Sequence, residues 1–94
     1  MPAVEYVIKS NEYAYWEMLF RMPEKQKELL VAIAKEVSAQ EVTSAHFVKK
    51  HRLTSASSVQ AALKGLFEKD FITHESGKIQ VYDKLFAIWL VKNY

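Results

Sequence analysis

Hydrophobic residues recur every three or four positions along most of the chain, which is the spacing of an amphipathic helix. The pattern predicts one helix from Glu12 to Met22, with Ser10 or Asn11 as its N-cap, and a second helix that begins at Pro23. Proline ends the first helix and suits the first turn of the second. The side chains expected to face the core from the second helix are Leu29, Leu30, Ile33 and Val37.

A short helix comes next in the pattern, and a tight turn joins it to a longer one. The short helix is expected to be capped at Thr43 or Ser44, and the longer one at Thr54 or Ser55. The longer helix should end near Asp70, because aspartate tolerates the left-handed conformation that a helix end often requires. Gly65 costs this helix up to about 1 kcal/mol relative to alanine unless a close contact requires it. The inward positions expected from both helices are Phe47, Val48, Val59, Ala62, Leu63 and Leu66.

The hydrophobic period then changes to about 2, which is typical of β-strands. Residues 71–74 and 79–82 predict the two strands of a hairpin, with the turn at residues 75–78. Asp83 follows the hairpin and is expected to cap a last helix, which runs to about Lys92.

The predicted fold is mainly α with a small β-hairpin: a winged helix-turn-helix flanked by N- and C-terminal helices. An isolated hairpin is marginal in water, so the side chains of Ile72, Ile79 and Val81 are expected to close the core under the helices. Residues 1–22 are expected to form an N-terminal lead-in segment and helix. Residues 23–94 are expected to form the winged helix-turn-helix domain with its C-terminal helix. We expect the two parts to make one compact unit, because 94 residues suffice for one core.

Three stretches of this chain resemble a known family. The run Leu53–Leu63 looks like the recognition helix, and Glu28–Ala34 like the opening helix, of the C-terminal winged-helix domain in archaeal-type P-loop ATPases, which also occur in bacteria. The run Val81–Leu90 resembles that family's ending, valine-x-aspartate-proline-x-phenylalanine-x-x-tryptophan-leucine, with Lys84 in place of the proline. The resemblance covers about residues 24–92. It implies a regulatory domain whose ATPase core lies elsewhere in a parent chain.

The sequence lacks the motifs that catalysis needs. A phosphate-binding loop uses glycines so that bare backbone amides can approach the phosphates, and neither Gly65 nor Gly77 lies in such a motif. The three histidines, His46, His51 and His74, do not have the spacing of metal ligands. No glycine-x-serine-x-glycine turn presents a nucleophile. We therefore expect no enzyme, no cofactor and no metal in this chain.

The sequence also favours the cytoplasm. There is no cysteine, and no apolar run approaches about 18 residues, so neither disulfides nor a membrane span is expected. The first residues lack the basic and apolar regions of a signal peptide.

Double-stranded DNA is one expected partner. In a winged helix the second helix of the motif enters the major groove, and the side chain of Gln60 can make a bidentate contact with adenine. The candidate DNA contacts are Lys49, Lys50, Arg52, Ser55, Ser57, Ser58, Gln60, Lys64 and Lys78. A net charge of only +2 argues for weak, salt-dependent binding, because phosphate contacts supply most of the affinity.

A protein surface is the other expected partner, and it is the hypothesis that we favour. Tyr13 and Tyr15 are two residues apart, about 200° around a helix, so they cannot both face inward. An exposed aromatic side chain can contact the ATPase domain of the parent chain or a second copy in a homodimer. The candidate interface residues are Tyr13, Tyr15, Trp16 and Trp89. Alternatively, Trp16, Phe20, Phe86 and Trp89 pack together and complete the core.

Overall fold

The computed structural model describes residues 8–36, 45–53 and 55–94. Its elements follow the predicted order: α2 (Glu12–Arg21), α3 (Glu24–Glu36), α4 (Ala45–Lys50), α5 (Ala56–Glu68), β1 (Ile72–Glu75), β2 (Lys78–Val81) and α6 (Lys84–Asn93). This order confirms the predicted fold class, a mainly helical winged helix-turn-helix with one small hairpin.

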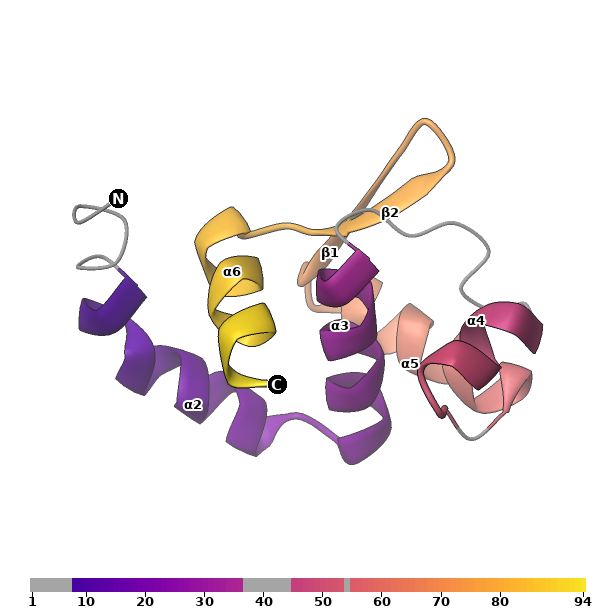
Figure 1. Cartoon of the computed structure of the whole chain (residues 1–94), viewed down its shortest axis with the longest axis horizontal. Coiled ribbons are helices and arrows are strands. Elements are labelled where there is room, and N and C mark those ends of the chain that lie inside the picture. The colour runs from indigo at the N-terminus through magenta and orange to yellow at the C-terminus, as the bar shows by residue number, and fades with distance from the viewer. Residues whose placement is uncertain (1–7, 37–44, 54) are drawn as a thin grey trace.

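Helix α3 is the centre of the fold. It packs against α5, α6 and β2, and α4 lies on the outer side, where it packs against α5. Figure 1 shows α3 standing between α6 on one side and the α4–α5 pair on the other, with α2 running past the lower end of α6. The hairpin extends away from the helices at the edge of the molecule. The turn motif and the N-terminal helix therefore lie at opposite ends.

The hairpin is antiparallel and closes in two residues. Ile72 lies opposite Val81 and Glu75 opposite Lys78, so each strand is shifted by one residue from its predicted bounds. Ser76 and Gly77 join the strands with φ values of 51° and 76°. Two successive left-handed residues match the right-handed twist of the strands, which is why this turn favours glycine.

The core is continuous from α2 to the hairpin and α6. Leu30, Ile33 and Leu66 are fully buried at its centre. The remaining buried side chains are Ile8, Tyr15, Leu19, Met22, Leu29, Ala32, Ala34, Phe47, Val59, Ala62, Ile72, Ile79, Val81, Phe86, Trp89 and Leu90. Val48 and Leu63 are only partly buried. The expected core position Val37 lies outside the described residues, as do the expected caps at residues 43, 44 and 54.

The predicted caps that the structure describes are confirmed for α5 and α6. The Ser55 Oγ accepts a hydrogen bond from the Ser58 amide at 3.2 Å. The Asp83 Oδ1 accepts bonds from the amides of Leu85 and Phe86 at 3.0 and 3.2 Å. Helix α2 is different, because its N-cap residue Asn11 makes no capping bond with its side chain.

The long helix α5 ends as predicted, and its glycine has a structural reason. Asp70 has a φ of 61°, in the left-handed region expected of it. A Cβ at Gly65 would lie 2.3 Å from the Gln26 Nε2, so the glycine lets the Gln26 side chain lie against α5. The Gln26 Oε1 there accepts a hydrogen bond from the Lys69 Nζ at 3.0 Å. The close contact that would justify a glycine in this helix is present.

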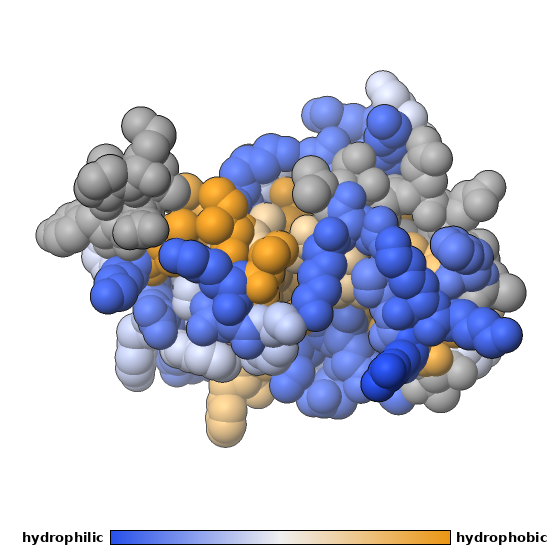
Figure 2. All heavy atoms as spheres, viewed as in Figure 1, coloured by the Kyte–Doolittle hydropathy of each residue, from blue (hydrophilic) through white to orange (hydrophobic). Residues whose placement is uncertain are grey.

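The surface is mostly hydrophilic on the face that Figure 2 shows. Orange, hydrophobic side chains gather over α6 and beside α3. None of the described helices is long and apolar enough to cross a membrane.

Candidate interaction surfaces

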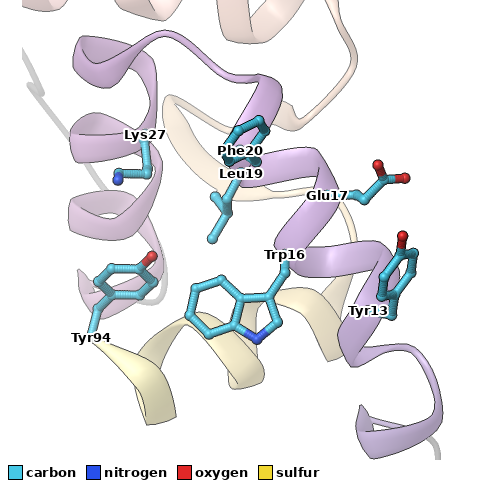
Figure 3. A pocket seen from close by; sticks show the side chains of 7 residues that line it. All are labelled: Tyr13, Trp16, Glu17, Leu19, Phe20, Lys27 and Tyr94. Carbon is cyan, nitrogen blue, oxygen red and sulfur yellow. The ribbon is translucent and has the colours of Figure 1, made fainter.

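The N-terminal helix brings a set of aromatic side chains to the surface. They surround a hollow of about 380 Å³, which we call the aromatic hollow. Its lining residues are Tyr13, Trp16, Glu17, Leu19, Phe20, Lys27 and Tyr94. Figure 3 shows Trp16 pointing into the space between α2 and Tyr94, while Lys27 reaches it from α3. Three segments that are far apart in the sequence thus build one site.

The two tyrosines of α2 lie on opposite sides of the helix, as predicted. Tyr13 is 78% exposed, whereas Tyr15 is 4% exposed. The Tyr15 ring packs against Phe86 and Trp89, with centroid distances of 4.9 and 5.3 Å. Burial raises the pKa of Tyr15, and the Asp83 carboxylate raises it further. The Tyr15 side chain is a core residue of the helix pair.

Two expectations about the aromatic residues are wrong. Tyr15 and Trp89 were expected at an interface, but both are buried behind the surface. Phe20 was expected to complete the core, but it is 91% exposed. Its neighbour Leu19 is buried instead, because α2 meets α6 with the side that carries Tyr15 and Leu19. Helical spacing alone does not say which of two adjacent apolar residues faces inward.

Trp16 links the surface to the core. Its ring meets the buried Trp89 ring edge to face at 4.8 Å, and it lies 6.4 Å from the Tyr94 ring. The Trp16 Nε1 lies 3.4 Å from the Glu12 carboxylate, to which it donates a hydrogen bond. These contacts with Glu12, Trp89 and Tyr94 hold Trp16 in place at the edge of the hollow. The Nε1 of the buried Trp89 has no hydrogen-bond partner in the described part of the chain.

Helix α5 presents a polar face to solvent. Ser57, Gln60 and Lys64 are exposed, at the spacing that places them on one side of the helix. The opposite side is buried against the core through Val59 and Leu66. The structure therefore brings three of the predicted DNA contacts together on one surface.

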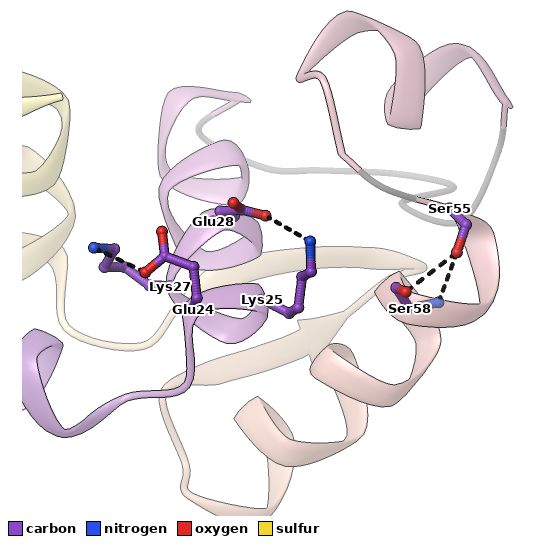
Figure 4. Close-up of polar contacts among 6 residues, drawn as sticks. All are labelled: Glu24, Lys25, Lys27, Glu28, Ser55 and Ser58. Atoms are coloured by element: carbon purple, nitrogen blue, oxygen red, sulfur yellow. Dashed lines mark hydrogen bonds and ion pairs between the residues drawn. The ribbon is translucent and has the colours of Figure 1, made fainter.

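The serines at the start of α5 have structural roles. The Ser55 hydroxyl is the N-cap, and it also lies 3.2 Å from the Ser58 Oγ and 3.3 Å from the Ser57 Oγ. Figure 4 shows these contacts between Ser55 and Ser58. The same view includes two surface ion pairs of α3, Lys25 with Glu28 and Lys27 with Glu24. Of the three serines, Ser57 is the most available to a ligand, because it is exposed and caps nothing.

The basic cluster of the turn is partly neutralised, which sequence reasoning missed. The Glu36 Oε1 lies 2.7 Å from the Lys50 Nζ and 2.7 Å from the His51 Nε2. The hydrogen bond from Lys50 and, to a smaller extent, the one from His51 hold the pKa of the Glu36 carboxyl below its usual value. Lys50 therefore carries an internal counter-ion. Lys49 and Arg52 are exposed at the same turn. No sequence signal links Glu36 to this cluster.

The wing tip is close to electrically neutral. Lys78 lies opposite Glu75 in the hairpin register, and both side chains are exposed. The only other titratable side chain of the two strands, His74, is also exposed. The wing offers one basic contact at most.

The described residues hold no group of three histidine, aspartate or glutamate side chains that could bind a metal ion.

Residues 13–92 match a protein family described as "Probable winged helix domain". No curated protein and no solved structure matches the chain. The match runs from the first turn of α2 to α6, and the order of helices and hairpin agrees with it. The chain therefore belongs to this family of winged helix domains.

Proposed function

We propose that this chain is a non-catalytic, cytoplasmic module that regulates a partner protein by docking through the aromatic hollow. The observation that carries the proposal is the exposure of several large aromatic side chains around one depression. Those side chains are Tyr13, Trp16, Phe20 and Tyr94. Aromatic residues are enriched at protein interfaces and dominate their binding energy.

The charges around the hollow favour a protein partner over a polyanion. Glu17 pairs with Arg21 at 3.6 Å, and Lys27 pairs with Glu24 at 3.3 Å, so the rim carries both signs. Nucleic acid binding depends on several uncompensated basic groups. A mixed polar rim around an apolar centre is the usual composition of a protein–protein interface.

The partner that we favour is the ATPase core of a parent chain. The support is the resemblance of residues 24–92 to the C-terminal domain of archaeal-type P-loop ATPases. In this structure the closing run of that resemblance has a packing role, since Asp83 caps α6 while Phe86 and Trp89 are buried. Apart from Lys27, the residues that line the hollow lie outside the resembling segment, on α2 and at Tyr94. They leave one surface for contact with another domain.

The test measures binding between the ATPase domain of the parent protein and this domain by calorimetry. Phe20→Ser removes the most exposed ring and should weaken binding at least tenfold, because exposed interface aromatics are typical hot spots. Tyr82→Ser is the matched control, since Tyr82 is an exposed aromatic near the hairpin and outside the hollow. Equal effects of the two substitutions would rule out the hollow as the docking site.

Duplex DNA is the second candidate, and the exposed face of α5 favours it. Ser57, Gln60 and Lys64 lie where a winged helix presents its major-groove contacts. The test is fluorescence anisotropy with a random-sequence duplex at several salt concentrations. If DNA is the ligand, the double variant Lys49→Ala with Lys64→Ala should release about two fewer counterions on binding. Its affinity for DNA should therefore fall less steeply as the salt concentration rises. Binding that does not change in this variant would reject α5 as a DNA-binding surface.

A further inference from the structure

The turn between α4 and α5 (Figure 1) carries four adjacent side chains that are basic or can become so, Lys49, Lys50, His51 and Arg52. Lys49 and Arg52 are exposed, and neither forms an ion pair within the described part of the chain. Lys50 and His51 differ, because the Glu36 Oε1 lies 2.7 Å from the Lys50 Nζ and 2.7 Å from the His51 Nε2. One carboxylate at the end of α3 thus separates two side chains that are open to a ligand from two that are engaged.

The contact between Glu36 and Lys50 has the geometry of a strong ion pair. Its length of 2.7 Å is at the short end for a bond between an ammonium and a carboxylate. The Glu36 and His51 side chains are only 25% and 12% exposed, so the carboxylate is partly shielded from water and salt. The His51 ring also packs on Phe47, at a centroid distance of 4.6 Å. The lowered pKa of the Glu36 carboxyl keeps it ionised at neutral pH, so Lys50 is drawn towards α3.

Arg52 stands at a strained position of the same turn. Its φ of 55° lies in the left-handed region, where a side chain with a Cβ is disfavoured and glycine is not. The Arg52 amide donates to the Lys49 carbonyl oxygen at 3.2 Å, and the next amide, of Leu53, donates to the Val48 carbonyl oxygen at 2.9 Å. These bonds close α4 with the kind of helix end at which glycine is the commonest residue. An exposed, charged side chain at such a position points to a use for the side chain itself.

We propose that Glu36 takes the place of a DNA phosphate at Lys50 and so limits how strongly the turn holds the DNA backbone. The inference rests on duplex DNA, the second candidate function. Lys49 and Arg52 are then the phosphate contacts of the turn, while Lys50 stays with Glu36 in the complex. Phosphate contacts strengthen binding to every sequence alike, whereas base contacts discriminate between sequences. Glu36 therefore raises the share of the binding energy that comes from the base contacts of α5, and it determines specificity without touching DNA.

The first test removes the charge of Glu36 and keeps its shape. Glu36→Gln in the full chain should bind a random-sequence duplex about three- to tenfold more tightly at about 0.1 M salt, and should release about one more counterion. The gain should be the same for two duplexes of unrelated sequence, because only a phosphate contact is added. Fluorescence anisotropy across a salt series measures both quantities. If Glu36 only supported the shape of the turn, its replacement would weaken binding instead.

A double-mutant cycle identifies the side chain that Glu36 restrains. Lys50→Met should cost at least about three times more affinity in the Glu36→Gln background than in the wild type, because only there does Lys50 reach a phosphate. Lys49→Met is the matched control, since Lys49 is a lysine of the same turn that forms no ion pair with Glu36. It should cost the same affinity in both backgrounds.

A second measurement needs no variant at Glu36, so the inference stays testable if Glu36→Gln does not fold. NMR of the lysine ammonium groups follows the wild-type chain as DNA is added, with Lys49→Met and Lys50→Met assigning the two signals. The Lys49 signal should shift, and the Lys50 signal should stay where it is. In Glu36→Gln both signals should shift.

Three results would overturn the inference and leave DNA as a ligand. They are weaker binding of Glu36→Gln, equal costs of Lys50→Met in the two backgrounds, and a shift of the Lys50 ammonium in the wild-type complex. If neither the wild type nor Glu36→Gln binds the duplex even at low salt, the DNA candidate fails together with the inference. The proposed role of the aromatic hollow stands in every case, because none of these measurements involves its residues.

Discussion

The Trp16 ring stands on the ring of Trp89, with centroids 4.8 Å apart and an interplanar angle of 85°. Edge-to-face pairs of this kind contribute about 0.5–1.5 kcal/mol beyond the area that they bury. Trp89 is 1% exposed, so a core residue fixes the orientation of a surface residue. The aromatic hollow is therefore preorganised, which lowers the cost of ordering side chains on binding.

Replacement of Trp89 and of Phe20 should separate core from surface. Trp89→Ala should destabilise the domain by about 3–5 kcal/mol, because it empties a large buried site. Phe20→Ala should change stability by less than about 0.5 kcal/mol, since the Phe20 side chain is 91% exposed. Urea unfolding followed by circular dichroism measures both. A large loss of stability in Phe20→Ala would place that ring in the core.

The Glu36 cluster should make stability depend on pH in the acid range. Because the folded pKa of Glu36 lies below its ordinary value, the cluster stabilises the fold above the ordinary pKa. The contribution is lost as the pH falls through the lowered folded pKa. Glu36→Gln should therefore be less stable than the wild type at pH 7, and the difference should vanish in acid. Urea midpoints of both proteins across this pH range provide the measurement. A difference that stays constant with pH would contradict the role of the Glu36 charge.

Gly65 and Gln26 should be energetically coupled. Gly65→Ala improves the helix propensity of α5 by up to about 1 kcal/mol, but its Cβ displaces the Gln26 amide and breaks the bond to Lys69. The single variant should therefore be close to the wild type in stability. In a Gln26→Ala background the same change should stabilise the domain by about 0.5–1 kcal/mol. A double-mutant cycle by thermal unfolding measures the coupling, and strict additivity would count against it.

The Asp83 cap should contribute measurably to the stability of the domain, whereas Asp70 should tolerate replacement by glycine. Asp83→Ala removes two hydrogen bonds to the first turn of α6 and should cost about 1 kcal/mol, within a range of about 0.5–2. Asp83→Ser should restore most of this loss, because a serine hydroxyl can accept the same bonds. Asp70→Gly, at the left-handed end of α5, should be neutral or slightly stabilising. Chemical denaturation of the three variants gives the comparison, and a full loss in Asp83→Ser would exclude capping as the cause.

The sequence alone determined the order of the elements, because that order depends on local periods and turn residues. The change of hydrophobic period marked the hairpin, the polar residues Ser55 and Asp83 marked two helix starts, and Asp70 marked a helix end. The opposite placement of Tyr13 and Tyr15 followed from helix geometry. Each of these features involves residues within a few positions of one another.

Only the tertiary structure decided which surfaces exist. Whether Leu19 or Phe20 is buried depends on the angle at which α2 meets α6, and neighbouring apolar letters do not specify that angle. The pairing of Glu36 with Lys50 joins residues of two helices whose separation depends on core packing. The apolar depression that is lined by Ala34, Val81 and Ile88 likewise needs α3, β2 and α6 to meet. The physical reason is that long-range contacts depend on the packing of whole elements, whereas caps and periods depend on each residue's immediate neighbours in the chain.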